Sequence, residues 1–200
     1  MTGVRNQGDC GSCWAFAIVG DVEGRYKLKF NKDIDLSEQQ LLDCNTDGND
    51  CNGGFYDTYD YVLDKGLVSE SSYPYKAKRE SCKYNSKNVA VKIKDTHDIG
   101  WFSSWFVDCE DLQDALKTGP IAVAVHSETS KWQKYKNGTL NTCTLGNKVD
   151  HAVLVVGWNK ASNLWTIKNS WGKGWGEQGY ITLKGGNCNR VCEHGYYASL

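Results

Sequence analysis

Hydrophobic positions in the first half of the chain follow the spacing of helices. Residues 14–27 start as an almost continuous apolar run and end in charged positions, which predicts a largely buried helix with a polar far end. Residues 36–42 predict a second helix, in which Ser37 is the N-cap and Gln40 completes a capping box. A third helix is predicted over 56–63, stopped by a following glycine. This half is therefore expected to be mainly helical.

The second half carries the patterns of strands. Short apolar or alternating runs are separated by Gly, Asn and Ser, and a helix predicted over 110–117 precedes them. A helical half followed by a β half predicts an α+β fold with two subdomains and a cleft between them. We expect a mainly helical subdomain at 1–100 and a mainly β subdomain at 101–200. The predicted strands are 121–125, 152–156, 164–167 and 180–183.

Charge and composition narrow the range of partners. The 200 residues carry 23 Lys and Arg against 24 Asp and Glu, a net charge of -1. Proteins that bind nucleic acids usually carry a basic excess on one face, so no nucleic-acid partner is expected. No apolar run approaches the roughly 20 residues that span a bilayer, so no membrane insertion is expected. Residues 1–5 lack the apolar core of a signal peptide, so a targeting segment, if the protein is secreted, has been removed.

Nine cysteines are an unusual number for a chain of this length. Because the count is odd, pairing leaves at least one thiol over, which indicates several disulfides and one free, working cysteine. Disulfides place the protein in an oxidising compartment. Metal binding is the alternative use, but the one CxxC motif is Cys10 to Cys13 and the four histidines are scattered singly. We therefore expect no metal site and no cofactor.

Cys13 is the candidate nucleophile. It lies where a glycine-containing turn runs into the first predicted helix. The thiolate is the reactive form, and both a helix N-terminus and a neighbouring imidazolium lower the pKa of a thiol. A redox CxxC is the alternative, but that motif normally follows a strand of a thioredoxin-like unit, and the segment before Cys10 is too short to supply one.

The segment Gln7-Gly8-Asp9-Cys10-Gly11-Ser12-Cys13-Trp14-Ala15-Phe16 resembles the nucleophile segment of the papain family of cysteine proteases. The likeness continues in order from Thr2 to Cys192. It implies a papain-like fold, with a helical left subdomain, a β-barrel-like right subdomain and the active-site cleft between them. It also implies a cathepsin-L-like endopeptidase, lysosomal, vacuolar or secreted, that acts on proteins or peptides. Further matching motifs are Cys51-Asn52-Gly53-Gly54, Tyr73-Pro74-Tyr75, Val149-Asp150-His151-Ala152-Val153 and Lys168-Asn169-Ser170-Trp171-Gly172.

The resemblance gives each candidate catalytic residue a role. Cys13 is the nucleophile, and His151 takes the thiol proton and later donates one to the leaving amine. Asn169 holds the imidazole in one orientation, and Trp171 shields their hydrogen bond from water, although core packing is the alternative for a single Trp. The side-chain amide of Gln7 and the backbone N–H of Cys13 donate to the oxygen of the tetrahedral intermediate.

Substrate-binding positions follow from the same motifs. The pocket for the second residue before the scissile bond is apolar and lacks an acidic group, which predicts a preference for Leu, Phe or Val over Arg. No long insertion follows Gly54, unlike in the family's carboxydipeptidases, and this favours an endopeptidase. The substrate-binding residues are Gly53, Gly54, Phe55, Tyr56, Ala124, Val149, Asp150, Ala152, Trp171 and Tyr197, the last as the pocket floor.

Eight cysteines are assigned to disulfides by the resemblance, with one question left open. Cys109 and Cys188 remain after the family's pairs are drawn and are candidates for a fourth bridge. The alternative is that Cys188 takes the place of Cys192 as the partner of Cys143, since sequence does not fix geometry. The implied pairs are Cys10–Cys51, Cys44–Cys82 and Cys143–Cys192.

The family also implies partners, namely the protein's own pro-segment and cystatin-type inhibitors, and a monomeric enzyme. A transglutaminase-like acyl transferase is one rival, but it leaves the Gln7 and Asn169 motifs unexplained. A catalytically impaired homologue that acts as a binding protein is the other, although such proteins tend to lose the nucleophile or the base. Asn137-Gly138-Thr139 fits a glycosylation sequon. The aromatic cluster at 101–106 is explained by none of the motifs.

Overall fold

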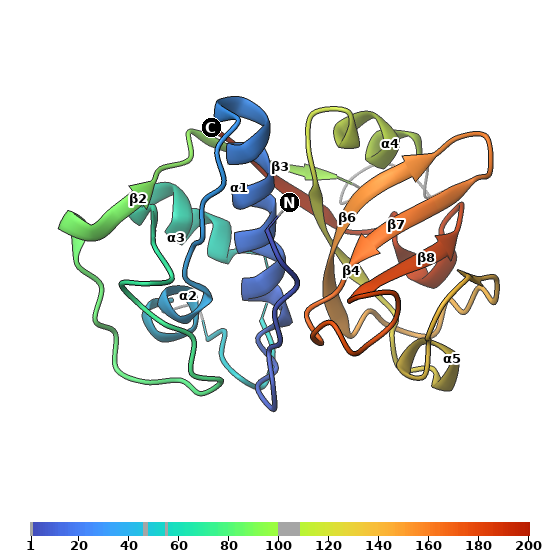
Figure 1. Ribbon diagram of the computed structural model, residues 1–200, viewed down its shortest axis with the longest axis horizontal. Helices are drawn as coiled ribbons and strands as arrows, with labels where there is room; N and C mark the ends of the chain where they lie inside the picture. The colour runs from blue at the N-terminus through green and yellow to red at the C-terminus, as the bar shows by residue number, and fades with distance from the viewer. Residues whose placement is uncertain (1, 46–47, 55, 100–108) are drawn as a thin grey trace.

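The long helix α1 (Cys13–Phe30) lies between the two halves of the molecule (Figure 1). The computed structural model describes residues 2–45, 48–54, 56–99 and 109–200, so Phe55 and the aromatic cluster at 101–106 lie outside the described residues. From Trp14 to Arg25 every side chain of α1 except Phe16 is buried. The apolar start of this helix is therefore a core element that packs on both halves, and its last, charged turn reaches solvent.

In the described residues of the helical half, two further α-helices follow α1, and the turn chemistry is partly as predicted. The hydroxyl of Ser37 accepts a hydrogen bond from the backbone N–H of Gln40 at 3.0 Å, which confirms the N-cap. The predicted capping box is wrong, because the Gln40 side chain bonds the carbonyl of Gly66 and the N–H of Val68. Gln40 is fully buried, and a buried amide needs partners that the tertiary structure supplies. The elements of this half are α2 (Glu38–Cys44), α3 (Thr58–Lys65), β1 (Leu67–Val68), the 3-10 helix η1 (Ser86–Asn88) and β2 (Val89–Val91).

The other half is built on one seven-stranded sheet in the order β3-β9-β4-β6-β7-β8-β5. All neighbouring strands are antiparallel except β5 and β8. The four predicted strands are confirmed as β4, β6, β7 and β8, and β6 is longer than predicted at both ends. The elements are β3 (Asp95–Ile99), α4 (Glu110–Leu116), β4 (Ile121–Val125), α5 (Ser130–Gln133), β5 (Thr139–Leu140), β6 (His151–Asn159), β7 (Leu164–Lys168), β8 (Tyr180–Lys184), the 3-10 helix η2 (Cys188–Arg190) and β9 (Gly195–Ser199).

Segments of the described chain pass from one half to the other. Strand β3 precedes residue 100, the expected boundary, yet it pairs with β9 in the large sheet. The N-terminal segment also reaches the β half, where Asn6 bridges Trp171 and the carbonyl of Arg5 accepts from Gly172 N at 2.9 Å. Among the described residues, no helix is long and apolar enough to cross a bilayer.

Asp21 on α1 joins the two halves through a buried carboxylate. It accepts hydrogen bonds from Tyr59 of α3 at 2.8 Å and from the N–H of Ala198 in β9 at 2.7 Å. Arg25, one turn further on, pairs with it at 2.5 Å and donates to the carbonyl of Pro120 at 3.0 Å. Burial raises the pKa of Asp21 to about 6, against the opposing effect of Arg25. The halves are thus held together by buried polar contacts on the central helix.

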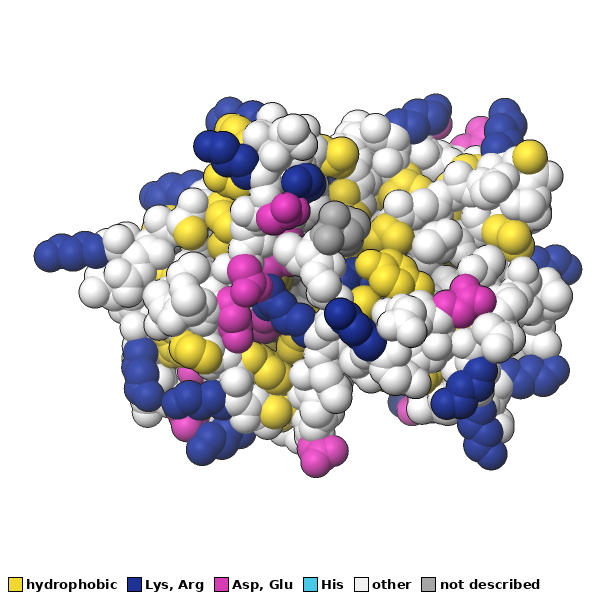
Figure 2. Space-filling view, in the orientation of Figure 1, with side chains coloured by type: hydrophobic (Ala, Val, Ile, Leu, Met, Phe, Trp, Pro, Cys, Tyr) yellow, Lys and Arg dark blue, Asp and Glu magenta, His cyan; other side chains and the backbone are white. Residues whose placement is uncertain are grey.

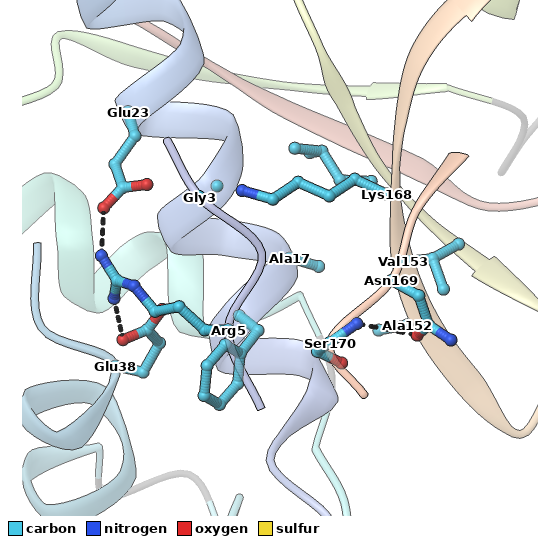
Figure 3. Close-up of a pocket in the computed structure, with 13 residues that line it drawn as sticks. Gly3, Arg5, Ala17, Glu23, Glu38, Ala152, Val153, Lys168, Asn169 and Ser170 are labelled. Carbon is cyan, nitrogen blue, oxygen red and sulfur yellow. Dashed lines mark hydrogen bonds and ion pairs between the residues drawn. The ribbon is translucent and has the colours of Figure 1, made fainter. Parts of the chain in front are cut away.

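Arg5 fastens the N-terminal segment to the helical half. Its guanidinium pairs with Glu23 of α1 at 2.8 Å and with Glu38, the first residue of α2 (Figure 3). On the other side of a small cavity of about 20 Å³, Lys168 of β7 donates to the carbonyl of Thr2 at 3.1 Å. Figure 2 shows acidic side chains gathered near this segment, with Lys and Arg spread around the rim of the same face.

Four disulfides are present, and the two of the helical half are paired as the resemblance implied. These are Cys10–Cys51 and Cys44–Cys82, with Cα atoms 4.5 and 4.7 Å apart. The implied pair Cys143–Cys192 is wrong, and so is a bridge between Cys109 and Cys188. The bonds are Cys143–Cys188, which confirms the alternative that the sequence left open, and Cys109–Cys192, with Cα atoms 4.6 and 5.2 Å apart. Cys188 and Cys192 lie on one short turn around η2, so spacing along the chain does not distinguish them, and only the three-dimensional position of each partner does.

Candidate active site

Cys13 is the free cysteine of the structure and the first residue of α1. The disulfide from Cys10 and a hydrogen bond from Gly11 N to the carbonyl of Cys51 at 2.7 Å hold the preceding turn against the 48–54 loop. A Cβ on Gly11 would lie 2.5 Å from that carbonyl oxygen, so the close approach requires glycine. The turn therefore presents Cys13 at the helix N-terminus, where unpaired N–H groups favour an anion.

His151, the first residue of β6, comes from the opposite half and lines the same cleft as Cys13. Burial raises the pKa of the Cys13 thiol, but the charge and hydrogen bond of His151 outweigh it, so the pKa lies below its ordinary value. The N–H of Ala152 contributes as a donor to the sulfur at 3.4 Å. Burial lowers the pKa of His151, but the Cys13 thiolate and Asn169 raise it above its ordinary value. Both shifts favour a thiolate–imidazolium pair.

Asn169 fixes the orientation of the His151 ring. Its Oδ1 accepts from the backbone N–H of Ser170 at 2.8 Å, which orients the amide, and lies 2.7 Å from Nε2 of His151. Since an amide oxygen only accepts, Nε2 carries a proton and Nδ1 is left for Cys13. The indole of Trp171 stacks on the imidazole with centroids 4.7 Å apart. Asn169 and His151 are 3% and 7% exposed, so water has little access to their hydrogen bond.

Gln7 lies beside the nucleophile with its side chain held at both ends. Its Oε1 accepts from the hydroxyl of Ser170 at 2.7 Å, and its Nε2 donates to the carbonyl of Cys10 at 3.0 Å. The backbone N–H of Gln7 also donates to the carbonyl of Ser170 at 2.8 Å. A primary amide has two N–H groups, so one remains free to donate. The N–H of Cys13, which has no acceptor within its helix, is a second donor on the same turn.

A cleft of about 450 Å³ opens between the two halves at Cys13 and His151. Seven of the ten predicted substrate-binding residues line it, and Phe55 lies outside the described residues. Gly54 is required at this wall, because a Cβ there would lie 2.6 Å from the ring of Trp14. The predicted residues that line the cleft are Gly53, Gly54, Tyr56, Ala124, Val149, Asp150 and Ala152.

The predicted pocket floor, Tyr197, does not line this cleft. Its ring packs between His97 and Arg25, with the guanidinium 4.3 Å from the ring centroid. The ring of the preceding residue, Tyr196, lies 4.8 Å from that of Tyr56, which does line the cleft. Successive residues of a strand point to opposite faces, so an error of one position moves the side chain to the other side of the sheet.

Sequence reasoning missed other residues of the site. Gly48, Asn49 and Asn52 also line the cleft. The stretch in which they lie is rich in Asn, Asp and Gly and ends in a motif shared with the family, which was the available signal. Ser170 was also missed. It lies within the Asn169 motif, and its hydroxyl donates to the side chain of Gln7. No group of three or more His, Cys, Asp or Glu side chains in the described part of the chain is arranged to hold a metal ion.

Comparisons with known proteins identify the family of this chain. Residues 1–199 match the family described as "Papain family cysteine protease". This chain belongs to the papain family of cysteine proteases, and the predicted papain-like α+β fold is confirmed by solved structures that match over its whole length.

Two of those structures show how close the fold is. The chain is 32% identical to the cysteine protease CMS1MS2 of Carica candamarcensis, solved in complex with E-64, with a TM-score of 0.89. It covers 93% of that chain. For the digestive procathepsin L 3 of Tenebrio molitor larval midgut the identity is 36%, the TM-score is 0.90 and 67% of that chain is covered.

Curated relatives include cathepsins. Cathepsin L 2 of Paramecium tetraurelia is 40% identical over 192 residues, which cover 94% of this chain and 57% of the relative. Cathepsin S of Mus musculus is 40% identical over 198 residues, with the same coverage of each chain. The chain thus spans little more than half the length of these relatives.

Proposed function

We propose that this chain is a cysteine endopeptidase that hydrolyses peptide bonds through a thioester acyl-enzyme. One observation carries the proposal. Of nine cysteines, the one left unpaired lies at a helix N-terminus and lines one cleft together with His151, whose ring Asn169 orients. A buried structural thiol would have its pKa raised by burial alone, whereas that of Cys13 is lowered.

In this proposal the residues of the site carry out acyl transfer in two steps. The Cys13 thiolate attacks the scissile carbonyl carbon, and the electron pair of the carbonyl moves to its oxygen, where Gln7 and the Cys13 N–H donate. As the C–N bond breaks, His151 gives its Nδ1 proton to the leaving amine and a thioester remains. Neutral His151 then takes a proton from water, whose oxygen attacks the thioester. The C–S bond breaks, which restores the thiolate and releases the carboxylic acid.

The lining of the cleft supports apolar specificity. Tyr56, Ala124, Val149 and Ala152 offer no acidic partner for a basic side chain, so Leu, Phe or Val is expected in place of Arg at the second position before the scissile bond. Asp150 also lines the cleft, but its carboxylate is occupied by the ring of His126 and the N–H and hydroxyl of Ser127. A fluorogenic peptide panel checks this, and a strong preference for Arg would contradict the assignment.

Cleavage within a chain is favoured over trimming from its ends. Helix α3 begins at Thr58, so only three residues separate it from Gly54 at the cleft wall. That connection leaves no room for an insertion that would block one end of the cleft. Peptides extended at both ends should be cleaved as well as peptides with a free terminus at the cleavage site.

The proposal extends to the inhibitors that bind this chain, to its pro-segment and to its location. The Carica protease was solved with E-64, and the Tenebrio relative is a procathepsin. We infer that this chain, too, reacts with an epoxide of the E-64 class and is covered by a pro-segment and by cystatin-type inhibitors. Its four disulfides support an oxidising compartment, lysosomal, vacuolar or extracellular. We expect a monomer, which light scattering would test.

An epoxide-probe experiment decides between the protease and a binding homologue. Folded protein with its disulfides intact should take up one equivalent of an E-64-type probe and cleave a fluorogenic peptide. Cys13→Ala should lose both, whereas His97→Asn, at a histidine of β3, should keep both. A folded wild-type chain that binds peptides but takes up no probe would favour the binding role instead.

A further inference from the structure

The hydroxyl of Tyr75 touches both segments that carry the donors of the proposed oxyanion site. It lies 2.8 Å from the carbonyl oxygen of Gln7 and 2.6 Å from the hydroxyl of Ser12, the residue before Cys13. Ser12 is fully buried and Gln7 is 8% exposed, so water does not readily replace these contacts. The mechanism described above uses neither Tyr75 nor Ser12.

The direction of these hydrogen bonds is fixed by chemistry. The Gln7 carbonyl oxygen only accepts, so the one proton of the Tyr75 hydroxyl is donated to it. Tyr75 then has only its lone pairs to offer Ser12, so the Ser12 hydroxyl donates to it at 2.6 Å in preference to the carbonyl of Cys10, which lies 3.5 Å away. The result is a directed chain from Ser12 through Tyr75 to Gln7. One phenol oxygen therefore holds two backbone segments at a fixed separation.

Tyr75 is itself held from outside the site. Its backbone N–H donates to Oε1 of Glu70 at 2.8 Å, and its ring packs edge-on against Phe16 of α1 with centroids 4.9 Å apart. The next backbone N–H, of Lys76, donates to the buried side chain of Gln39 at 2.8 Å. These contacts hold the phenol in place between the helical core and the turn before Cys13.

We propose that Tyr75 is a positioning residue that sets the distance between the Gln7 amide and the Cys13 N–H. This rests on the proposed function, because it concerns the oxygen that develops charge during peptide hydrolysis. Tyr75 does not reach the reacting atoms; it acts through Gln7 and Ser12. Preorganised donors gain their effect from fixed placement, and loss of one donor typically costs about 10²–10³ in rate. Loosening the placement of both donors should lower the rate by a part of that factor, about 10-fold.

Tyr75→Phe tests the proposal, because it removes the hydroxyl and keeps the ring. We expect kcat to fall about 10-fold with KM nearly unchanged. Affinity for a peptide aldehyde, whose adduct places an oxygen between the two donors, should fall by a similar factor. The rate of Cys13 alkylation by iodoacetamide, which forms no oxyanion, should stay as in wild type. The matched control is Tyr84→Phe, whose hydroxyl also donates to a backbone carbonyl, that of Lys65 at 2.9 Å.

A double-mutant cycle separates positioning from general loosening. If Tyr75 acts through Gln7, Tyr75→Phe should have little further effect on kcat in a Gln7→Ala background. Ser12→Ala supplies a second variant that breaks the same chain at its other end. Equal kcat values for wild type and Tyr75→Phe, or full additivity with Gln7→Ala, would refute the proposal. A wild-type chain without peptidase activity would instead refute the proposed function.

A second, independent observation concerns Asn137. The sequon Asn137-Gly138-Thr139 lies in the turn between α5 and β5, at the outer edge of the β half (Figure 1), and Asn137 is exposed. The turn is built on Gly138, whose φ is 75°, and its N–H donates to Glu177 at 2.7 Å. We infer that Asn137 carries an N-linked glycan, because it is exposed and stands first in a sequon on a surface turn.

Translation with microsomes tests this directly. Behind a heterologous secretion signal, the protease-protected chain should migrate as one glycan heavier, and endoglycosidase H should remove the difference. Thr139→Ala should abolish the shift, and Asn163→Gln, at an exposed asparagine outside any sequon, should leave it in place. A protease-protected chain without the shift would overturn the inference, since protection shows that the chain was translocated.

Discussion

The side-chain oxygen of Asn169 lies 2.7 Å from Nε2 of His151, and this contact decides which nitrogen of the ring is left for Cys13. The two residues come from the ends of neighbouring strands, β6 and the segment after β7, and Trp171 covers their hydrogen bond. Asn169→Ala should therefore lower kcat by about 10- to 100-fold, a part of the 10²–10⁴ that a positioned acid–base group contributes. Steady-state kinetics measure it.

The control for that variant is Asn159→Ala at the far end of β6. Its side chain also accepts from a backbone N–H, that of Ser162 at 3.1 Å, but it is exposed. It should keep wild-type kcat. Equal losses in the two variants would mean that the Asn169 effect is not specific to His151.

Cys13 should be alkylated at a lower pH than an ordinary thiol, because its pKa is lowered. His151→Asn removes the charge that lowers the Cys13 pKa and leaves the burial that raises it. In this variant the pKa should rise above the ordinary value, so alkylation should require a higher pH than in wild type. The pH dependence of the iodoacetamide rate measures both pKa values. Coincident profiles would show that the pair does not exist.

Peptidase activity should follow a bell-shaped pH profile. Its acid limb reports protonation of the thiolate, below the usual thiol range, and its alkaline limb reports loss of the imidazolium proton, above the usual imidazole range. Activity should thus be highest between the two limbs, which belong to the coupled pair. A single-limbed rise toward high pH would indicate an isolated thiol.

Tryptic digestion without reduction should reveal the disulfides of the β half, because cleavage after Arg190 separates Cys188 from Cys192. Peptide 137–148 should be recovered linked to 185–190, and peptide 95–117 linked to 191–200, after any sugar is removed. Mass spectrometry identifies each linked pair. Recovery of 137–148 linked to 191–200 would restore the pairing that the family resemblance implied.

Acid should stabilise the fold through Glu38. Burial raises its pKa to about 8, with Glu23 acting in the same direction and Arg5 opposing, from 4.5 in the unfolded chain. Between these values the folded state holds the proton more tightly, so this contribution to the free energy of unfolding is present below pH 4.5 and lost as the pH rises to about 8. Urea unfolding between pH 5 and 8 should show the decline.

Glu38→Gln should flatten that decline, because the amide mimics the protonated carboxyl and does not titrate. A residual slope should remain from Asp21, whose pKa is raised by burial to about 6. Glu128→Gln, at an exposed glutamate, is the control and should keep the wild-type slope. Parallel slopes for the two variants would exclude Glu38 as the source.

The sequence by itself determined the class of the fold and most of the site. The apolar start of α1, the strands β4, β6, β7 and β8, and the motifs around Cys13, His151 and Asn169 all carry local patterns. Periodicity reports which face is buried, and a motif reports residues whose chemistry is needed together. The Cys13 motif is far from the other two in the chain, and the structure brings Cys13 to one cleft with His151, whose ring Asn169 contacts.

Only the tertiary structure decided the features that depend on which distant residue lies opposite. These are the partners of Cys143 and Cys192, the buried bonds of Gln40, and the choice of Tyr196 over Tyr197 beside the cleft. For the cysteines and the tyrosines, two neighbouring candidates have the same local chemistry, and for Gln40 the buried partners lie more than 20 residues away. The physical reason is that a side chain's partner is set by the direction of its Cα–Cβ bond in the folded backbone. A shift of one residue along a strand, or of four residues along a turn, changes that direction without changing the pattern of residue types in the sequence.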